Sequence, residues 1–196
     1  MIDRIEEYKN KRRKRRIRRI IFALFFVAFA TMLSWFFESQ ATTTVILTTH
    51  ADVDSNSSVN SGLSQRGFAT ADALQELLNS VDVVAGVDAI YATPLRATQE
   101  TAEPLMKSLD IPITLIEDAS EVEGLIETIM AKHKGKIILV VTHPDVLPKL
   151  VAELHGSKNI PIIERDEFDN IYIVTIPWFG KVKTLRLHYG LLIPQI

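Results

Sequence analysis

An uncharged apolar run of eighteen residues near the N-terminus constrains this chain more than any other feature. It extends from Ile20 to Phe37 and reads IIFALFFVAFATMLSWFF. At about 1.5 Å per residue, a helix of this length spans roughly 27 Å, close to the hydrocarbon thickness of a bilayer. A helix buried in a soluble core is rarely apolar on every side. We therefore expect residues 20–37 to form one transmembrane helix.

A strongly basic segment precedes this run. Residues 1–19 contain ten Lys or Arg against three Asp or Glu, although the net charge of the whole chain is −2. The positive-inside rule places residues 1–19 in the cytoplasm and the C-terminal part outside it, in a periplasm or its equivalent. Next to a spanning segment, a topology signal with affinity for anionic lipid is a simpler interpretation than nucleic-acid binding or an import signal.

A cleaved signal peptide is the alternative to an anchor. The apolar region of a signal peptide is usually ~7–15 residues long, which is shorter than this run. The candidate cleavage site Ala28-Phe29-Ala30 is followed by more apolar residues. We therefore favour an uncleaved signal anchor, with the aromatic residues from Trp35 onward at the far interface.

The rest of the chain predicts one α/β domain. After a linker at 38–43, residues 44–196 suffice for a single domain with its own core. Strand patterns are expected at 44–48, 89–92, 112–116, 137–141, 171–176 and 181–187. Helix patterns are expected at 64–78, 96–109, 121–132 and 146–154. This alternation predicts a three-layer α/β/α domain with a mostly parallel central sheet, closed by a hairpin of the last two strands.

Two kinds of chemistry are disfavoured by residues that are missing. The chain contains no Cys, which excludes disulfides, Cys-ligated zinc and thiol catalysis. The segment after the first expected strand is rich in Ser and Asn rather than Gly. It therefore does not resemble a phosphate-binding loop, and we expect no nucleotide cofactor.

Two of the expected strands end in histidine. The segments VILTTHAD and IILVVTHPD carry His50 and His143 directly after their apolar residues. Ligand sites in open α/β sheets lie beyond the carboxyl ends of the strands. We therefore expect both imidazoles at the same edge of the sheet, where together they form a candidate site.

Five segments, taken in order over about residues 43–190, resemble the histidine phosphatase superfamily (phosphoglycerate mutase-like). They are TVILTTHAD, GLSQRGFATADALQELL, DAIYATPLRATQETAEPL, IILVVTHPDVLPKLVAEL and FDNIYIVTIPWFGKVKTLRLHYG. The resemblance implies that His50 attacks phosphorus and becomes phosphohistidine, and that His143 hydrogen-bonds the transferred group. It also implies two pocket arginines and a nearby carboxyl that protonates the leaving group. The substrate would be a phosphorylated small molecule or phosphoprotein.

The chain departs from this family at both arginine positions. Thr49 stands where an arginine normally precedes the nucleophilic histidine, and Ala97 stands at the second position. Arg96, one residue earlier, is the candidate replacement; Arg66 and Lys149 are other nearby cations. The general acid is open among Glu117, Asp118 and Glu121, which qualify by position alone.

Three functions remain open at this point. The first is a divergent phosphatase, and the second is an inactive membrane-tethered binding module with the same fold. The third is a divalent-metal site built from the two His-x-Asp pairs, His50 with Asp52 and His143 with Asp145. Asp residues at such positions more often cap helices or turns, which disfavours the metal site.

Overall fold

The computed structural model describes residues 2–39, 42–54, 60–81, 86–116, 122–154 and 167–190. The chain divides into two compact units, Met1–Gln40 and Ala41–Ile196. The boundary between the units falls inside the linker expected at 38–43. The first unit is a single helix and the second holds the sheet, so each is described by itself.

The first unit is the helix α1, Ile2–Ser39. Among the described residues it contains one segment, Arg12–Phe36, that passes the length and composition test for crossing a membrane, with a mean hydropathy of 2.0 in its most apolar 18-residue window. The helix is longer than the expected 20–37 because the basic segment continues it without a break. Arginine and lysine are good helix formers, so this continuation follows from their propensity.

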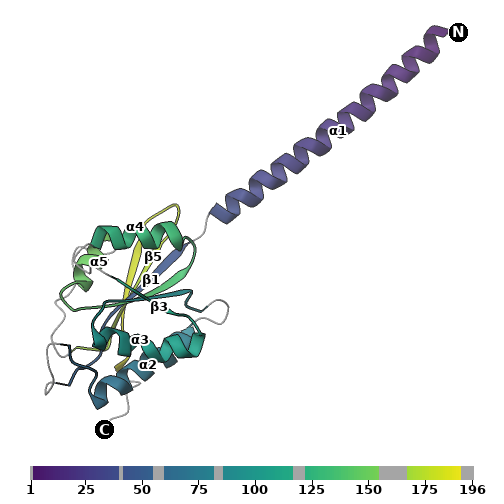
Figure 1. The fold of residues 1–196 in the computed structure, drawn as a ribbon. Coiled ribbons are helices and arrows are strands. Elements are labelled where there is room, and N and C mark those ends of the chain that lie inside the picture. The colour runs from purple at the N-terminus through teal and green to yellow at the C-terminus, as the bar shows by residue number, and fades with distance from the viewer. Residues whose placement is uncertain are drawn as a thin grey trace. The chain divides into compact units, whose positions relative to one another are not determined.

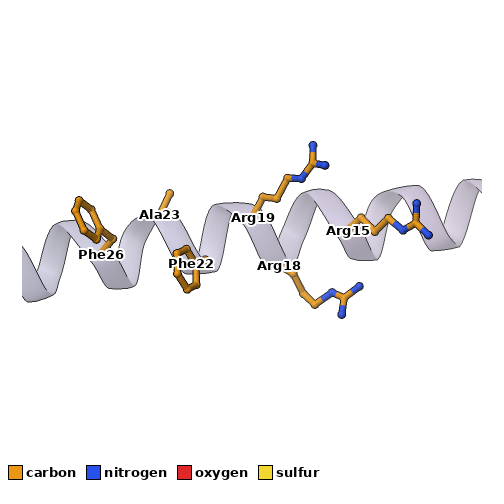
Figure 2. A pocket seen from close by; sticks show the side chains of 6 residues that line it. All are labelled: Arg15, Arg18, Arg19, Phe22, Ala23 and Phe26. Carbon is orange, nitrogen blue, oxygen red and sulfur yellow. The ribbon is translucent and has the colours of Figure 1, made fainter.

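The shallow hollow in Figure 2 lies on one face of α1. Arginines line its N-terminal half and two phenylalanines flank a small alanine in the other half: Arg15, Arg18, Arg19, Phe22, Ala23 and Phe26. All of these side chains are exposed. A single exposed helix encloses no cavity, and this hollow holds no group able to act as a nucleophile.

The second unit contains a six-stranded sheet with the order β3-β2-β4-β1-β5-β6. The strands are β1 Thr43–Thr49, β2 Ala89–Ala92, β3 Ile113–Leu115, β4 Ile137–Thr142, β5 Asn170–Ile176 and β6 Lys183–His188. The first four strands are mutually parallel, whereas β5 runs antiparallel to both of its neighbours, β1 and β6, and forms the expected hairpin with β6. The predicted mixed sheet, mostly parallel, is confirmed.

Four helices cover the two faces of this sheet (Figure 1). They are α2 Gln65–Val81, α3 Arg96–Leu109, α4 Val122–Lys132 and α5 Leu147–Glu153. One core cluster joins a sheet face to α2 and α3, and a second joins the opposite face to α4 and α5. The three-layer α/β/α prediction is therefore confirmed, and each expected element of this unit lies within a few residues of its predicted limits.

Alternation along β1 assigns its side chains to these two layers. Val45 and Leu47 belong to the cluster under α4 and α5, whereas Ile46 belongs to the cluster under α2 and α3. Since successive residues of a strand point to opposite faces, Thr49 points to the α4/α5 side. This assignment matters for the site, because Thr49 directly precedes His50.

Candidate active site

The carboxyl ends of β1 and β4 bring His50 and His143 together. These strands pair in parallel with Thr49 opposite Thr142, so the residue after each strand emerges at the same edge. The main-chain N–H of His50 donates to the carbonyl of Thr142 at 3.0 Å. The two imidazole rings lie 5.5 Å apart between centroids. The predicted pairing of the two histidines is therefore seen in the geometry.

The ring of His50 is fixed in one tautomer. Its Nδ1 lies 2.9 Å from the carbonyl oxygen of Ala51. A carbonyl oxygen can only accept, so Nδ1 carries the proton and Nε2 keeps its lone pair. His50 is only 8% exposed, and this burial lowers its pKa below the ordinary histidine value. A neutral imidazole with a free Nε2 is the state that a nucleophile requires.

His143 has a different environment from His50. Its side chain is 43% exposed, and its Nδ1 lies 3.3 Å from a carboxylate oxygen of Asp145. The carbonyl of His143 accepts from the N–H groups of Val146 and Leu147, so the residue closes the turn that begins α5. This histidine is thus anchored through its main chain while its ring remains open to a ligand.

Helix α3 fixes the position of Ala51, the residue that follows His50. The hydroxyl of Thr101 accepts from the Ala51 N–H at 2.9 Å and donates to the Ala97 carbonyl at 2.7 Å. Thr101 is 1% exposed, so both hydrogen bonds are protected from water. Through this bridge α3 sets the position of Ala51, whose carbonyl in turn fixes the ring of His50.

The Ser-x-x-Gly start of α2 closes over the same loop. Ser64 donates from its hydroxyl to the Asp52 carboxylate at 2.7 Å and accepts from the Gly67 N–H, as an N-cap does. A Cβ added at Gly67 would lie 2.1 Å from the Asp52 carbonyl oxygen. Only glycine allows this close approach, which explains Gly67, the second glycine of the GLSQRG motif.

The contacts of Asp52 and Asp145 bear on the metal alternative. Its carboxylate is bonded to Ser64, while Asp145 lies beside the other histidine. Within the described ranges, no three His, Asp or Glu side chains form a group that could hold a metal ion.

Thr49 and Ala97 occupy the two positions where the related family has arginines, and neither side chain is charged. Thr49 is fully buried, and its hydroxyl has no hydrogen-bond partner among the described residues. Ala97 is 4% exposed and packs with Ala51 and Leu63. Both positions are therefore part of the core that supports His50, and neither brings a charge to it.

Arg96 is paired with a carboxylate. Its Nε lies 2.6 Å from a Glu100 oxygen, and its main-chain N–H donates to the side chain of Asn60. The other Glu100 oxygen accepts from the Leu63 N–H at 2.7 Å, which fixes the carboxylate. The recorded contacts of Arg96 thus join it to the 60–63 segment, and the described residues show none between it and either histidine.

The remaining sequence candidates lie elsewhere or cannot be placed. Arg66 and Lys149 are exposed on α2 and α5, as expected of solvated helix residues. Glu117, Asp118 and Glu121, the candidate general acids, lie outside the described residues. Arg186 of β6, which the sequence did not suggest, donates to Glu167 and Asn170 and is therefore also paired.

Two residues of the site were missed by sequence reasoning. The ring of Phe168 lies 6.1 Å from that of His50, and Thr101 forms the bridge to Ala51. Thr101 belongs to a segment that resembles the family, so its position could have suggested a role. Phe168 precedes β5 and is separated from His50 by more than a hundred residues, so no local pattern reveals the contact.

Comparison with known proteins agrees with this geometry. Residues 45–125 match the family model described as the histidine phosphatase superfamily (branch 1). This part of the globular unit is similar in sequence to that superfamily. The match covers β1 through the first residues of α4 and thus includes His50, whereas His143 lies beyond it. No curated protein matches the chain.

Solved structures of phosphatases share the fold of the globular unit. The protein histidine phosphatase SixA, complexed with tungstate, has a TM-score of 0.62 at 18% identity, with 76% of this chain and 99% of that chain covered. A mycobacterial glucosyl-3-phosphoglycerate phosphatase has a TM-score of 0.54 at 14% identity, with 68% and 90% covered. A phosphoserine phosphatase from Entamoeba histolytica has a TM-score of 0.51 at 15% identity, with 69% and 93% covered. These identities show the fold alone.

Proposed function

We propose that this chain is a phosphohydrolase that works through a phosphohistidine at His50. The observation that carries the proposal is the hydrogen bond from His50 Nδ1 to the Ala51 carbonyl, which leaves Nε2 unprotonated. Phosphoryl transfer needs little covalent chemistry from the protein beyond a positioned nucleophile and favourable charge around the phosphoryl oxygens. The burial of His50 and the hydrogen bond of its Nδ1 support the first of these requirements.

The reaction has two steps in this proposal. His50 Nε2 forms a bond to phosphorus as the bond from phosphorus to the leaving oxygen, or to the leaving nitrogen of a phosphohistidine, breaks. The leaving group takes a proton from solvent. Water then attacks phosphorus, the N–P bond breaks, and inorganic phosphate is released with His50 neutral again. In this proposal His143, whose ring centroid lies 5.5 Å from that of His50, donates a hydrogen bond to the phosphoryl oxygens.

The substrate is a phosphomonoester or a phosphohistidine side chain. The solved relatives bear names with different phosphorylated substrates, namely a phosphoprotein histidine, a sugar phosphoglycerate and phosphoserine. Their shared feature is the phosphoryl group rather than the group that carries it. A phosphohistidine peptide is our first choice, because SixA is described as a protein histidine phosphatase.

A binding module without turnover is the second candidate, and one observation favours it. Arg96 is neutralised by Glu100, and Thr49 and Ala97 carry no charge. An arginine on a transferring phosphoryl group can contribute roughly 10³-fold or more in rate. In this second function the globular unit would recognise a partner while tethered to a membrane.

The membrane attachment belongs to the proposal. We place α1 across a bilayer, with residues 1–19 in the cytoplasm and the globular unit on the periplasmic or extracytoplasmic side. The supporting observations are the exposed apolar residues from Ile20 to Phe36 and the cluster of arginines before them. Protease protection of the globular unit in sealed spheroplasts and inverted vesicles tests this topology.

The test of catalysis compares two matched variants of the full chain in detergent. His50→Gln removes the nucleophile with little change in volume, and His133→Gln changes a histidine that bonds Tyr91 instead. Phosphate release is measured from an aryl phosphate and from a phosphohistidine peptide. We expect turnover in the wild type and the His133 variant and none in the His50 variant. Equal turnover in all three would reject His50 as the nucleophile. No turnover in any of them would reject the phosphatase and leave the binding module.

A further inference from the structure

The turn between β5 and β6 exposes two large aromatic side chains. Trp178 is 53% exposed and Phe179 is 83% exposed. Lys181 and Lys183 follow them and are also exposed. Aromatic rings next to cationic side chains are the composition that favours the boundary between lipid headgroups and hydrocarbon. A turn that served only to connect two strands would need neither ring.

The turn that carries the exposed rings lies at a defined end of the sheet. Thr43, the first residue of β1, pairs with Ile176, the last residue of β5. The turn that follows Ile176 therefore lies at the same end of the sheet as the start of β1 (Figure 1). Both mark the end of the globular unit that is opposite to the histidines.

Chain connectivity limits how far this end can be from the end of α1. The helix ends at Ser39 and β1 begins at Thr43. Four residues of fully extended chain span at most about 14 Å. If α1 crosses a bilayer, the end of the sheet that carries Trp178 and Phe179 is consequently held within reach of the membrane surface.

We infer that the β5–β6 turn docks on the bilayer that α1 crosses, with Trp178 and Phe179 inserted at the interface and Lys181 and Lys183 among anionic headgroups. The inference rests on the membrane attachment proposed above and is independent of turnover. Docking gives the chain a second point of contact with the bilayer, in addition to the helix. It therefore restricts rotation of the globular unit.

This orientation has a consequence for the histidines. His50 lies seven residues beyond Thr43 along a strand, which corresponds to roughly 23 Å at the usual rise. The edge that carries His50 and His143 is then directed away from the membrane. Substrates would reach it from the aqueous side, as suits a soluble phosphorylated molecule or a phosphoprotein rather than a lipid.

The test uses tryptophan fluorescence of the full chain in vesicles. The chain has two tryptophans, so Trp35→Phe leaves Trp178 as the single reporter. The protein is reconstituted in phosphatidylcholine and phosphatidylglycerol vesicles, with and without lipids brominated near the headgroup end of the acyl chain. We expect a blue-shifted emission that loses most of its intensity with brominated lipid and is shielded from aqueous iodide.

A matched control moves the reporter to the opposite end of the sheet. The triple variant Trp35→Phe, Trp178→Phe and Leu115→Trp places one tryptophan at the carboxyl end of β3, where Leu115 is 49% exposed. This tryptophan should emit as a water-exposed ring, respond to iodide and ignore brominated lipid. If Trp178 behaves in the same way, or is blue-shifted without quenching by brominated lipid, docking is refuted.

Flotation of the same vesicles separates this failure from others. A chain that floats with the vesicles but exposes Trp178 to water retains its anchor and loses only the docking surface. A chain that does not float refutes the anchor and the docking together. Phosphate release measured on these samples reports on His50 alone, so the outcome for catalysis is distinguishable from both.

Discussion

Thr49 and Thr142 lie opposite each other on β1 and β4, and both hydroxyls are buried without a hydrogen-bond partner among the described residues. Each directly precedes one of the site histidines. Alternation along the two strands directs both side chains to the α4/α5 face, together with Leu47 and Val140. The sheet edge beneath the histidines is thus built from two small polar residues, one of them at the position where the related family has a charged one.

Replacing these threonines by valine should not destabilise the fold. A buried hydroxyl without a partner costs about 1–3 kcal/mol, and valine has a similar shape. We expect Thr49→Val and Thr142→Val to leave the free energy of unfolding unchanged or higher in urea titrations. Thr48→Val is the matched control, because the Thr48 hydroxyl donates to the Asn170 carbonyl at 2.8 Å. That variant should lose about 1 kcal/mol; equal losses in all three variants would show that the first two hydroxyls have partners.

The buried state of His50 predicts the pH dependence of turnover. Burial is the largest cause that lowers its pKa, and His143 acts in the same direction, against the Ala51 carbonyl and Asp52. The neutral, nucleophilic form therefore persists at a lower pH than in an ordinary histidine. We expect the acid limb of kcat/KM to lie below pH 6.5. An acid limb above that value would contradict the assignment of His50.

The free energy of unfolding should also depend on pH through the lowered pKa of His50. Below about pH 6.5 the unfolded chain binds protons that buried His50 does not, so the free energy of unfolding decreases as the pH falls toward the lowered pKa. His50→Gln should flatten part of this decrease in thermal melts. His133, whose pKa is also lowered by burial, accounts for a further part, so the slope should not vanish.

Much of the globular unit could be predicted from the sequence because its signals are local. The apolar strand before His143 and the helix that starts at Arg96 follow from periodicity and turn residues, and β4 and α3 lie where these signals place them. The shared edge of the two histidines followed from the rule for parallel strands. These predictions needed no knowledge of which side chains touch.

The rest of the site depends on contacts that no local pattern encodes. Arg96 and Glu100 have the i, i+4 spacing of a helical salt bridge, which the sequence reveals. The hydrogen bond that fixes the Glu100 carboxylate comes from the Leu63 N–H in another segment. The contact between Phe168 and His50 requires β5 to return beside β1. The burial of Thr49 and Ala97 is likewise set by packing. The sequence could therefore reveal the missing arginines but not that both positions lie in the core.

The pairing of Arg96 with Glu100 predicts a small effect of removing the arginine. We expect Arg96→Ala to lower kcat/KM by less than about tenfold, against the roughly 10³-fold or more that a phosphoryl-binding arginine contributes. Glu100→Gln, which keeps an acceptor for the Leu63 N–H, is the companion variant and should leave turnover similar. A thousandfold loss in Arg96→Ala alone would show that the guanidinium leaves Glu100 to bind the phosphoryl group.

Thr101 is a positioning residue whose effect should be separable from simple destabilisation. Thr101→Val has the same shape but removes the acceptor for the Ala51 N–H and the donor to the Ala97 carbonyl. We expect a loss of about 1–3 kcal/mol in urea titrations and a fall in kcat, because the Ala51 carbonyl no longer holds the ring of His50. Thr101→Ser restores the hydroxyl and should recover kcat more fully than stability, since it still lacks the methyl group. If serine recovers stability but not kcat, or if valine leaves kcat and its acid limb unchanged at a temperature where the variant is folded, then Thr101 supports the core without orienting His50.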